Sequence, residues 1–110
     1  MMFQKVATTD EIWAGEMMPV ECAGHCVLLV NLDHTIYAYE NACPHLRTPL
    51  SEGSLQGKVL TCSTHGWQFD AGNGHGVNPR TARLKPVAVQ VENEDILIEI
   101  SSTESQENHE

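Results

Sequence analysis

The chain has 110 residues, of which 41 % are apolar, and its formal net charge is −9 at pH 7. This length suits one domain, and the apolar fraction is well above that of a disordered chain. Fifteen acidic residues against six basic ones exclude the basic patch that nucleic-acid binding needs and argue against an anionic membrane surface. No apolar run is long enough to span a membrane, and the start lacks a signal-peptide core, so a cytoplasmic protein is expected. Four cysteines in that compartment are expected to be thiols or metal ligands.

The first forty residues have the pattern of short strands. Apolar and alternating runs predict strands over residues 3–6, 16–22, 27–30 and 35–39, and a polar cap predicts one helical turn over residues 8–11. Asp33 and His34 form a tight turn between the last two runs, so residues 27–39 are expected to form a hairpin.

Residues 41–83 have a different character, because turn residues dominate and six of the eight glycines fall there. We expect a hairpin around Gln56 and Gly57, and a short strand over residues 67–69. Long irregular segments in a compact domain are usually functional, so this insert is where a site should lie.

Strand signals return after Pro86. Alternating apolar residues predict two strands joined by a turn, over residues 87–91 and 96–100. Residues 102–110 contain no apolar side chain and are expected to form a disordered tail.

Two Cys/His pairs lie in the insert: Cys43 with His45, and Cys62 with His65. Each pair offers a thiolate and an imidazole, which suit iron and zinc but not calcium or magnesium. Positions two or three apart in a loop can direct both side chains at one point. A chance placement of both pairs in one turn-rich segment is far less plausible than a metal site.

Two metal sites are compatible with these donors. A structural zinc site with two cysteines and two histidines would make the chain a zinc-stabilised binding module. A Rieske [2Fe–2S] centre instead uses two cysteines on one iron and two histidines on the other. The Cys-x-His spacing is not a usual zinc half-site.

The residues around both pairs resemble the motif of bacterial Rieske ferredoxins. The matching stretches are residues 43–45, 62–70, 74–76, 78–79 and 10–17. Residues 10–17 and 74–79 are especially similar to the ferredoxins of toluene and o-xylene monooxygenase systems.

The resemblance implies an all-β Rieske fold over residues 1–101. A small antiparallel β-sandwich base would carry an inserted loop-rich cluster-binding subdomain over about residues 41–83. One [2Fe–2S] cluster per chain would be held by Cys43, His45, Cys62 and His65, with the cysteines on the inner iron and the histidines on the outer iron.

The resemblance also implies an electron-transfer component of a multicomponent oxygenase rather than an enzyme. A monomer would carry one electron from an NADH-dependent flavin or flavin/iron–sulfur reductase to the diiron hydroxylase of an aromatic-hydrocarbon monooxygenase, through transient docking. A ferredoxin of a ring-hydroxylating dioxygenase is the alternative.

Thr48 and Thr64 stand where high-potential Rieske proteins have a disulfide-forming pair of cysteines. The hydroxyl donors near the cluster of those high-potential proteins are also lost, with Trp67 and Phe69 in the corresponding region. With fewer donors to the cluster sulfurs, the reduction potential should lie nearer about −150 mV than +300 mV.

Two further groups of residues are left with alternatives. Cys22 and Cys26, with His25 between them, are expected to be incidental thiols rather than a second metal site. Three of the six bases, Arg80, Arg83 and Lys85, form either a docking patch or a solvated one.

Overall fold

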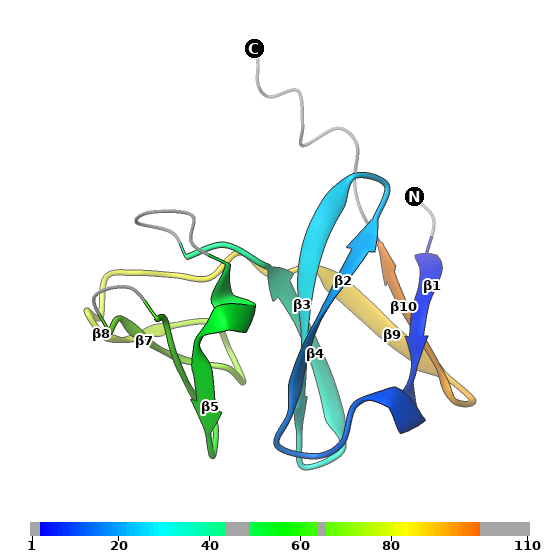
Figure 1. Ribbon diagram of the computed structural model, residues 1–110, viewed down its shortest axis with the longest axis horizontal. Helices are drawn as coiled ribbons and strands as arrows, with labels where there is room; N and C mark the ends of the chain where they lie inside the picture. Colours follow the sequence, from blue (N-terminus) through cyan, green and yellow to red (C-terminus); the bar gives the residue numbers. More distant parts are fainter. Residues whose placement is uncertain (1–2, 44–48, 64–65, 100–110) are drawn as a thin grey trace.

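The computed structural model describes residues 3–43, 49–63 and 66–99. Within these residues the chain forms three antiparallel sheets, which lie side by side in Figure 1. The first sheet has the order β1 (Phe3–Thr8), β10 (Asp95–Glu99), β9 (Ala88–Glu92), and the second has the order β2 (Met17–Cys22), β3 (His25–Leu32), β4 (Thr35–Glu40). The third sheet comprises β5 (Ser54–Gln56), β6 (Val59–Thr61), β7 (Gln68–Asp70) and β8 (Gly76–Asn78). Two 3₁₀ turns, η1 (Thr9–Glu11) and η2 (Leu50–Glu52), complete the elements.

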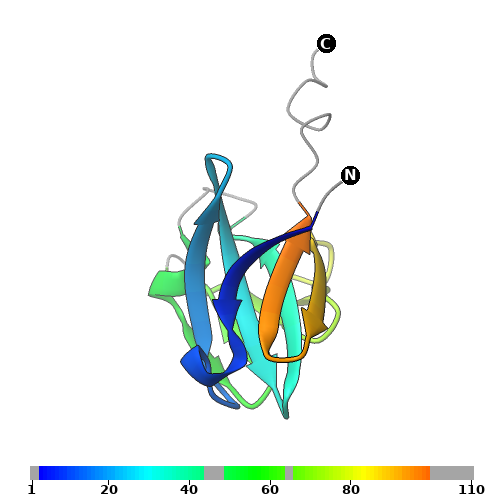
Figure 2. The ribbon, with the colours of Figure 1, turned by 90° about the vertical axis from the view of Figure 1, so that its right-hand side faces the viewer.

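We call the first two sheets the base and the third the four-stranded sheet. Val87 N donates to Ala38 O at 2.9 Å, and Tyr39 forms an isolated bridge with Pro86, so the segment before β9 pairs with β4 and joins the two base sheets. Figure 2 faces the outer sheet of the base, with β10 between β1 and β9.

Strand β3 is the centre of the molecule because both of its faces are buried. Leu28 and Val30 enter a first core between the base and the four-stranded sheet, whereas Val27 and Leu29 enter a second core inside the base. Alternate side chains of a strand point to opposite faces, which is why one continuous apolar run supplies both cores. The remaining members of the first core are Tyr39, Cys43, Leu50, Leu60, Cys62, Phe69, Ala71 and Leu84.

The two long hairpins of the base turn through residues with positive φ. Asp33 and His34 have φ of 55° and 73°, and Ala23 and Gly24 have φ of 53° and 82°. Two consecutive residues of this kind match the right-handed twist of the flanking strands, as in type I′ turns. The hairpin predicted over residues 27–39 is therefore confirmed.

The expected all-β fold is confirmed, with two elements that the sequence pattern did not predict. Strand β8 occupies a glycine-rich stretch that has too little alternation to be read as a strand, and it forms by pairing with β7. Turn η2 follows Pro49 and lacks a helical pattern of its own. The predicted tail over residues 102–110 lies outside the described residues.

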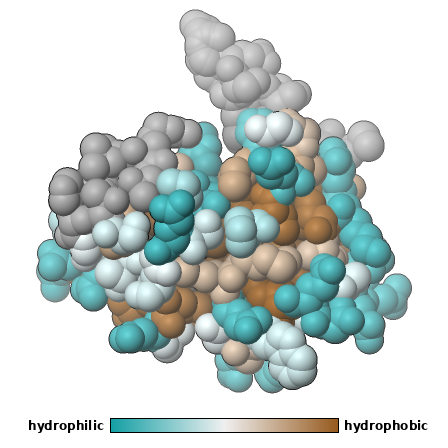
Figure 3. Space-filling model, in the orientation of Figure 1, coloured by the Kyte–Doolittle hydropathy of each residue, from teal (hydrophilic) through white to brown (hydrophobic). Residues whose placement is uncertain are grey.

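On the face shown in Figure 3, apolar surface gathers over the base, with a second patch at the lower left, on the side of the four-stranded sheet. Partly buried apolar side chains that pack against the second core are Val6, Met18, Val20, Val87 and Val89. These side chains extend the second core toward the surface of the base.

Candidate metal centre

Cys43 and Cys62 enter the first core from two different segments. Cys43 lies three residues beyond the end of β4, and Cys62 follows directly after β6. Their exposed fractions are 0 % and 1 %, and both belong to the core that separates the base from the four-stranded sheet. Both are thiols rather than disulfide sulfurs. The fold thus brings together two soft donors that are 19 positions apart in the sequence.

His45 and His65 lie outside the described residues, as do Thr48 and Thr64. Within residues 3–43, 49–63 and 66–99, no three His, Cys, Asp or Glu side chains are grouped as metal ligands. That finding covers only two of the four predicted ligands. The described part of the site nevertheless fits a thiolate-bound metal group, because two thiols from separate loops share one apolar core.

The turn after Cys62 is closed by a hydrogen bond from Cys62 N to Trp67 O, at 2.7 Å. Gly66 within it has φ of 68°, a left-handed conformation that glycine adopts without a steric penalty. The turn therefore connects β6 to β7 and places Cys62 at one end of the four-stranded sheet.

Asn41 closes the segment that contains Cys43. Its side chain is 7 % exposed. Its Oδ1 accepts a hydrogen bond from Ser51 N at 2.9 Å, and its Nδ2 donates to Ser51 Oγ at 3.1 Å and to Cys26 Sγ at 3.2 Å. A buried amide with these partners holds the end of β4, the turn η2 and the start of β3 together.

The end of η2, at Gly53, approaches the end of β6, at Thr61, too closely for any side chain at Gly53. A Cβ atom on Gly53 would lie 2.0 Å from Thr61 O, although its backbone conformation suits any residue. This contact brings the segment after Cys43 against the strand that leads to Cys62.

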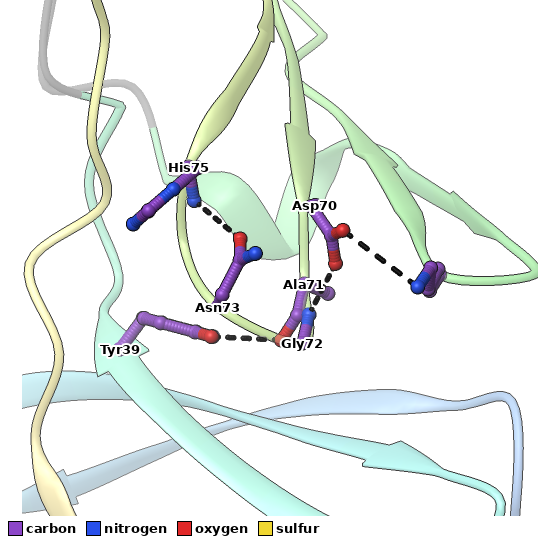
Figure 4. A network of polar contacts seen from close by, with 7 residues as sticks. Tyr39, Asp70, Ala71, Gly72, Asn73 and His75 are labelled. Carbon is purple, nitrogen blue, oxygen red and sulfur yellow. Dashed lines mark hydrogen bonds and ion pairs between the residues drawn. The ribbon is translucent and has the colours of Figure 1, made fainter.

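Tyr39 links the base to the far end of the four-stranded sheet. Its hydroxyl donates to Ala71 O at 2.8 Å, and the neighbouring turn is held by Gly72 N donating to Asp70 Oδ1 at 2.8 Å (Figure 4). Burial raises the pKa of Tyr39 to about 12, with smaller contributions from the charges of Tyr37 and Asp70. The phenol therefore stays protonated and keeps donating well above neutral pH.

Cys22 and Cys26 lie on opposite faces of the β2–β3 hairpin. Cys22 pairs with His25 in the strand register and Cys26 with Glu21, so their side chains alternate. Cys22 is buried in the second core and its thiol donates to Gln4 Oε1 at 3.3 Å, whereas Cys26 is exposed. The two thiols do not share a site, which agrees with the expectation that they are not a second metal centre.

Asn41 and Tyr39 were not among the residues predicted to matter for the site. Asn41 stands two positions before Cys43 at a strand end, and that proximity is the only signal in the sequence. Nothing in the sequence indicates that Tyr39 contacts Ala71, because the contact depends on how the sheets pack.

A family model of the Rieske [2Fe–2S] domain matches residues 2–97 of the chain. The chain belongs to the Rieske [2Fe–2S] domain family. The predicted family is thus confirmed, and with it the [2Fe–2S] cluster as the cofactor.

The relatives of this Rieske protein include ferredoxins of two kinds of oxygenase. The ferredoxin component of the alkene monooxygenase system of Xanthobacter autotrophicus is 38 % identical over 94 residues, which are 84 % of this chain and 77 % of that protein. The biphenyl dioxygenase ferredoxin subunit of a Pseudomonas species is 32 % identical over 103 residues, 92 % of this chain and 94 % of that protein.

A solved structure described as a complex of reduced oxygenase and oxidised ferredoxin in carbazole 1,9a-dioxygenase contains a similar chain. The match has a TM-score of 0.80 and 28 % identity, and it covers 87 % of this chain and 91 % of the other.

These similarities make this Rieske protein an electron-transfer component, of the ferredoxin type found in oxygenase systems, rather than an enzyme. None of the helices in the described residues is long and apolar enough to cross a membrane.

Proposed function

We propose that Cys43, His45, Cys62 and His65 hold the [2Fe–2S] cluster. The burial of both cysteines in one core supports their part in this ligand set. His45 and His65 lie two and three positions from them in the sequence, within reach of the same point. When bound, the cluster supplies storage for one electron, on the iron with imidazole ligands, because thiolates stabilise the ferric state of the other iron.

We propose that the domain extends over residues 1–101, with a cluster-binding subdomain over about 41–83. The four-stranded sheet, which lies apart from the base in Figure 1, supports this division. The protein would act in the cytoplasm as a monomer, with residues 102–110 as a disordered tail. Its potential would be low within the Rieske range, since Thr48 and Thr64 leave no disulfide between the two cluster loops.

The electron donor would be an NADH-dependent flavin or flavin/iron–sulfur reductase, and the acceptor would be the diiron hydroxylase of an aromatic-hydrocarbon monooxygenase. The single observation that carries the monooxygenase assignment is the 38 % identity to a monooxygenase ferredoxin. The similarity to the biphenyl dioxygenase subunit favours a second candidate acceptor, a ring-hydroxylating dioxygenase. Electron carriers of this kind must dissociate quickly, so a small and weak interface is expected with either.

Iron and sulfide analysis of the purified protein, with absorption and reduced-state EPR spectra, tests the ligand set. Two irons and two sulfides per chain are expected in the wild type, and loss of both in each variant that replaces one of the four ligands. A colourless, EPR-silent protein with one zinc would contradict the proposal, and so would a ligand variant with normal iron content.

Reconstitution separates the two acceptors. The reduced protein is mixed in a stopped-flow instrument with a purified diiron monooxygenase hydroxylase or with a purified ring-hydroxylating dioxygenase. Faster oxidation by the hydroxylase, followed by product formation, is expected. Faster oxidation by the dioxygenase would select the second candidate.

A further inference from the structure

The chain from residue 71 to residue 91 is free of acidic side chains. No Asp or Glu occurs between Asp70 and Glu92, although the whole protein has fifteen acids and a net charge of −9. The same stretch contains Arg80, Arg83 and Lys85, half of all the basic residues. On a protein with a net negative charge, these positive charges mark a distinct surface.

Residues 74–84 of this stretch form the outer edge of the four-stranded sheet. After β8 the chain turns back, with Gly76 N donating to Ala82 O at 2.9 Å and Leu84 N donating to Gly74 O at 2.8 Å. His75 and Arg83 form an isolated bridge in this return. Residues 82–84 therefore lie beside residues 74–76, at the start of β8, and place Arg83 on the outside of the sheet.

The tip of this return lies at the same end of the sheet as Cys62. Gln68 pairs with Thr61 on one side and with Asn78 on the other. Since β6 and β8 run in the same direction, the residues that follow them, Cys62 and Pro79, leave the sheet at one end. Arg80 is the next residue, so the basic edge begins where the proposed ligand Cys62 stands.

The Arg83 guanidinium is held in place by backbone rather than by an acid. Its Nη1 donates to Arg80 O at 2.9 Å and to Ala82 O at 3.0 Å. Neither ion pair in the described residues involves Arg80 or Arg83, and both side chains are exposed. A planar guanidinium that is already oriented loses less entropy when it binds a carboxylate with its remaining N–H groups.

The acids nearest in the fold do not neutralise this edge. Asp70 directs its carboxylate to Gly72 N (Figure 4). Its Oδ2 also lies 3.8 Å from Lys58 Nζ. Glu40 N donates to Lys85 O, so Lys85 lies next to an acidic residue. Lys85 is therefore left out of the proposed surface. Glu52 precedes β5, which is the opposite edge of the sheet.

We propose that Arg80 and Arg83, with Val77 beside them, form the docking surface for a carboxylate-bearing face of the oxygenase component. Val77 is 45 % exposed, and it lies in β8, three positions before Arg80 in the sequence. An apolar contact with a charged rim suits a transient interface, in which opposite charges raise the association rate more than the affinity. This inference rests on the proposed function, because it places the acceptor beside the cluster ligand Cys62.

The test compares two variants of the cluster-loaded protein with equal net charge. Arg80→Gln/Arg83→Gln and Lys5→Gln/Lys58→Gln each remove two positive charges and change the net charge from −9 to −11. The control lysines form exposed ion pairs with Asp95 and Asp70, and pairs of this kind contribute little to stability. Stopped-flow oxidation by the purified oxygenase component is measured at ~0.01 M and ~1 M ionic strength, where the Debye lengths are about 30 Å and 3 Å.

At low ionic strength the arginine variant should react at least about fivefold more slowly than the wild type, while the lysine variant stays within about twofold. At high ionic strength the three proteins should converge. Equal rates of oxidation by the oxygenase in the two variants would overturn this docking surface alone. The same holds if the arginine variant is slower only in its reduction by the purified reductase. A wild-type protein that contains a cluster but does not pass electrons to the oxygenase would overturn the proposed function instead.

Discussion

The base and the four-stranded sheet are built differently. Strand β3 of the base has eight residues, whereas each strand of the four-stranded sheet has three. Three-residue strands bury few side chains, so apolar burial alone stabilises the four-stranded sheet less than the base. The four-stranded sheet instead uses the hydrogen bonds of Asn41 and Tyr39, the close approach at Gly53 and, as proposed, the cluster.

This difference suggests that the base folds by itself. The four-stranded sheet is completed by its contacts with the base and by the cofactor. The second core contains neither Cys43 nor Cys62, whereas the first core contains both. Perturbing the cluster ligands, or the contacts of Asn41, Tyr39 and Gly53, should therefore affect the base and the four-stranded sheet unequally.

Removing a cysteine ligand should have the largest effect. Cys43→Ser or Cys62→Ser is expected to abolish the visible absorption of the cluster, because each proposed thiolate is lost. Amide hydrogen exchange should then become fast in β5–β8 and remain slow in β1, β3 and β10. Cys26→Ser is the matched control, since Cys26 is exposed, lies outside the first core, and as serine keeps an acceptor for Asn41 Nδ2. Equal loss of protection in both regions would show that the base depends on the cluster too.

Gly53→Ala should be the most damaging change away from the ligands. The new Cβ would lie 2.0 Å from Thr61 O, a backbone atom that cannot rotate away. The free energy of unfolding, measured with urea, should fall by about 3 kcal/mol. Gly72→Ala is the control, because its Cβ would meet only side-chain atoms, Asp70 Oδ1 at 3.2 Å and Leu32 Cδ1 at 3.8 Å, and should cost less than about 1 kcal/mol. Similar midpoints for the two variants would contradict the close approach.

Asn41→Ala should destabilise the segment around Cys43 by about 2 kcal/mol, because Ser51 N loses its buried acceptor. Release of iron to a chelator should also be faster than in the wild type. Ser51→Ala is the comparison, since it removes only the hydroxyl and keeps the Ser51 N to Asn41 Oδ1 bond. If Ser51→Ala releases iron as fast as Asn41→Ala, the backbone contact is not the important one.

Tyr39→Phe should have the smallest effect at neutral pH, about 1 kcal/mol, through loss of the bond to Ala71 O. Its pH dependence is the sharper signature. The folded pKa is about 12 against 10.0 for an unperturbed tyrosine, so the unfolded chain releases this proton first. The stability that the neutral phenol contributes is complete below pH 10 and is lost as the pH rises toward 12. Urea titrations across this range should show that loss in the wild type and a smaller one in the variant.

The base could be predicted well from the sequence, and the four-stranded sheet less well. The alternation in residues 96–100 and the apolar run 27–30 each predict a strand, and β10 and β3 contain them. Strand β8 was missed because Gly76, Val77 and Asn78 have no pattern of their own and become a strand only against β7. At the site, the sequence predicted Cys43 and Cys62 through the spacing of the Cys/His pairs, and the structure places both in one core, whereas Asn41 was not predicted.

The sequence by itself predicted the all-β class and, through its resemblance to the Rieske motif, the family, and it proposed the donor set. The fold class follows from hydrophobic alternation and the proposed donors from the spacing of two Cys/His pairs, both of which are local information. Only the tertiary structure decided that Cys43 and Cys62 share one core and that Cys22 and Cys26 face opposite sides of a hairpin. It also placed the acid-free edge with Arg80 at the end of the sheet where Cys62 stands. Those relations depend on which strands pair and in which register. Pairing and register are decided only when residues far apart in the sequence pack together.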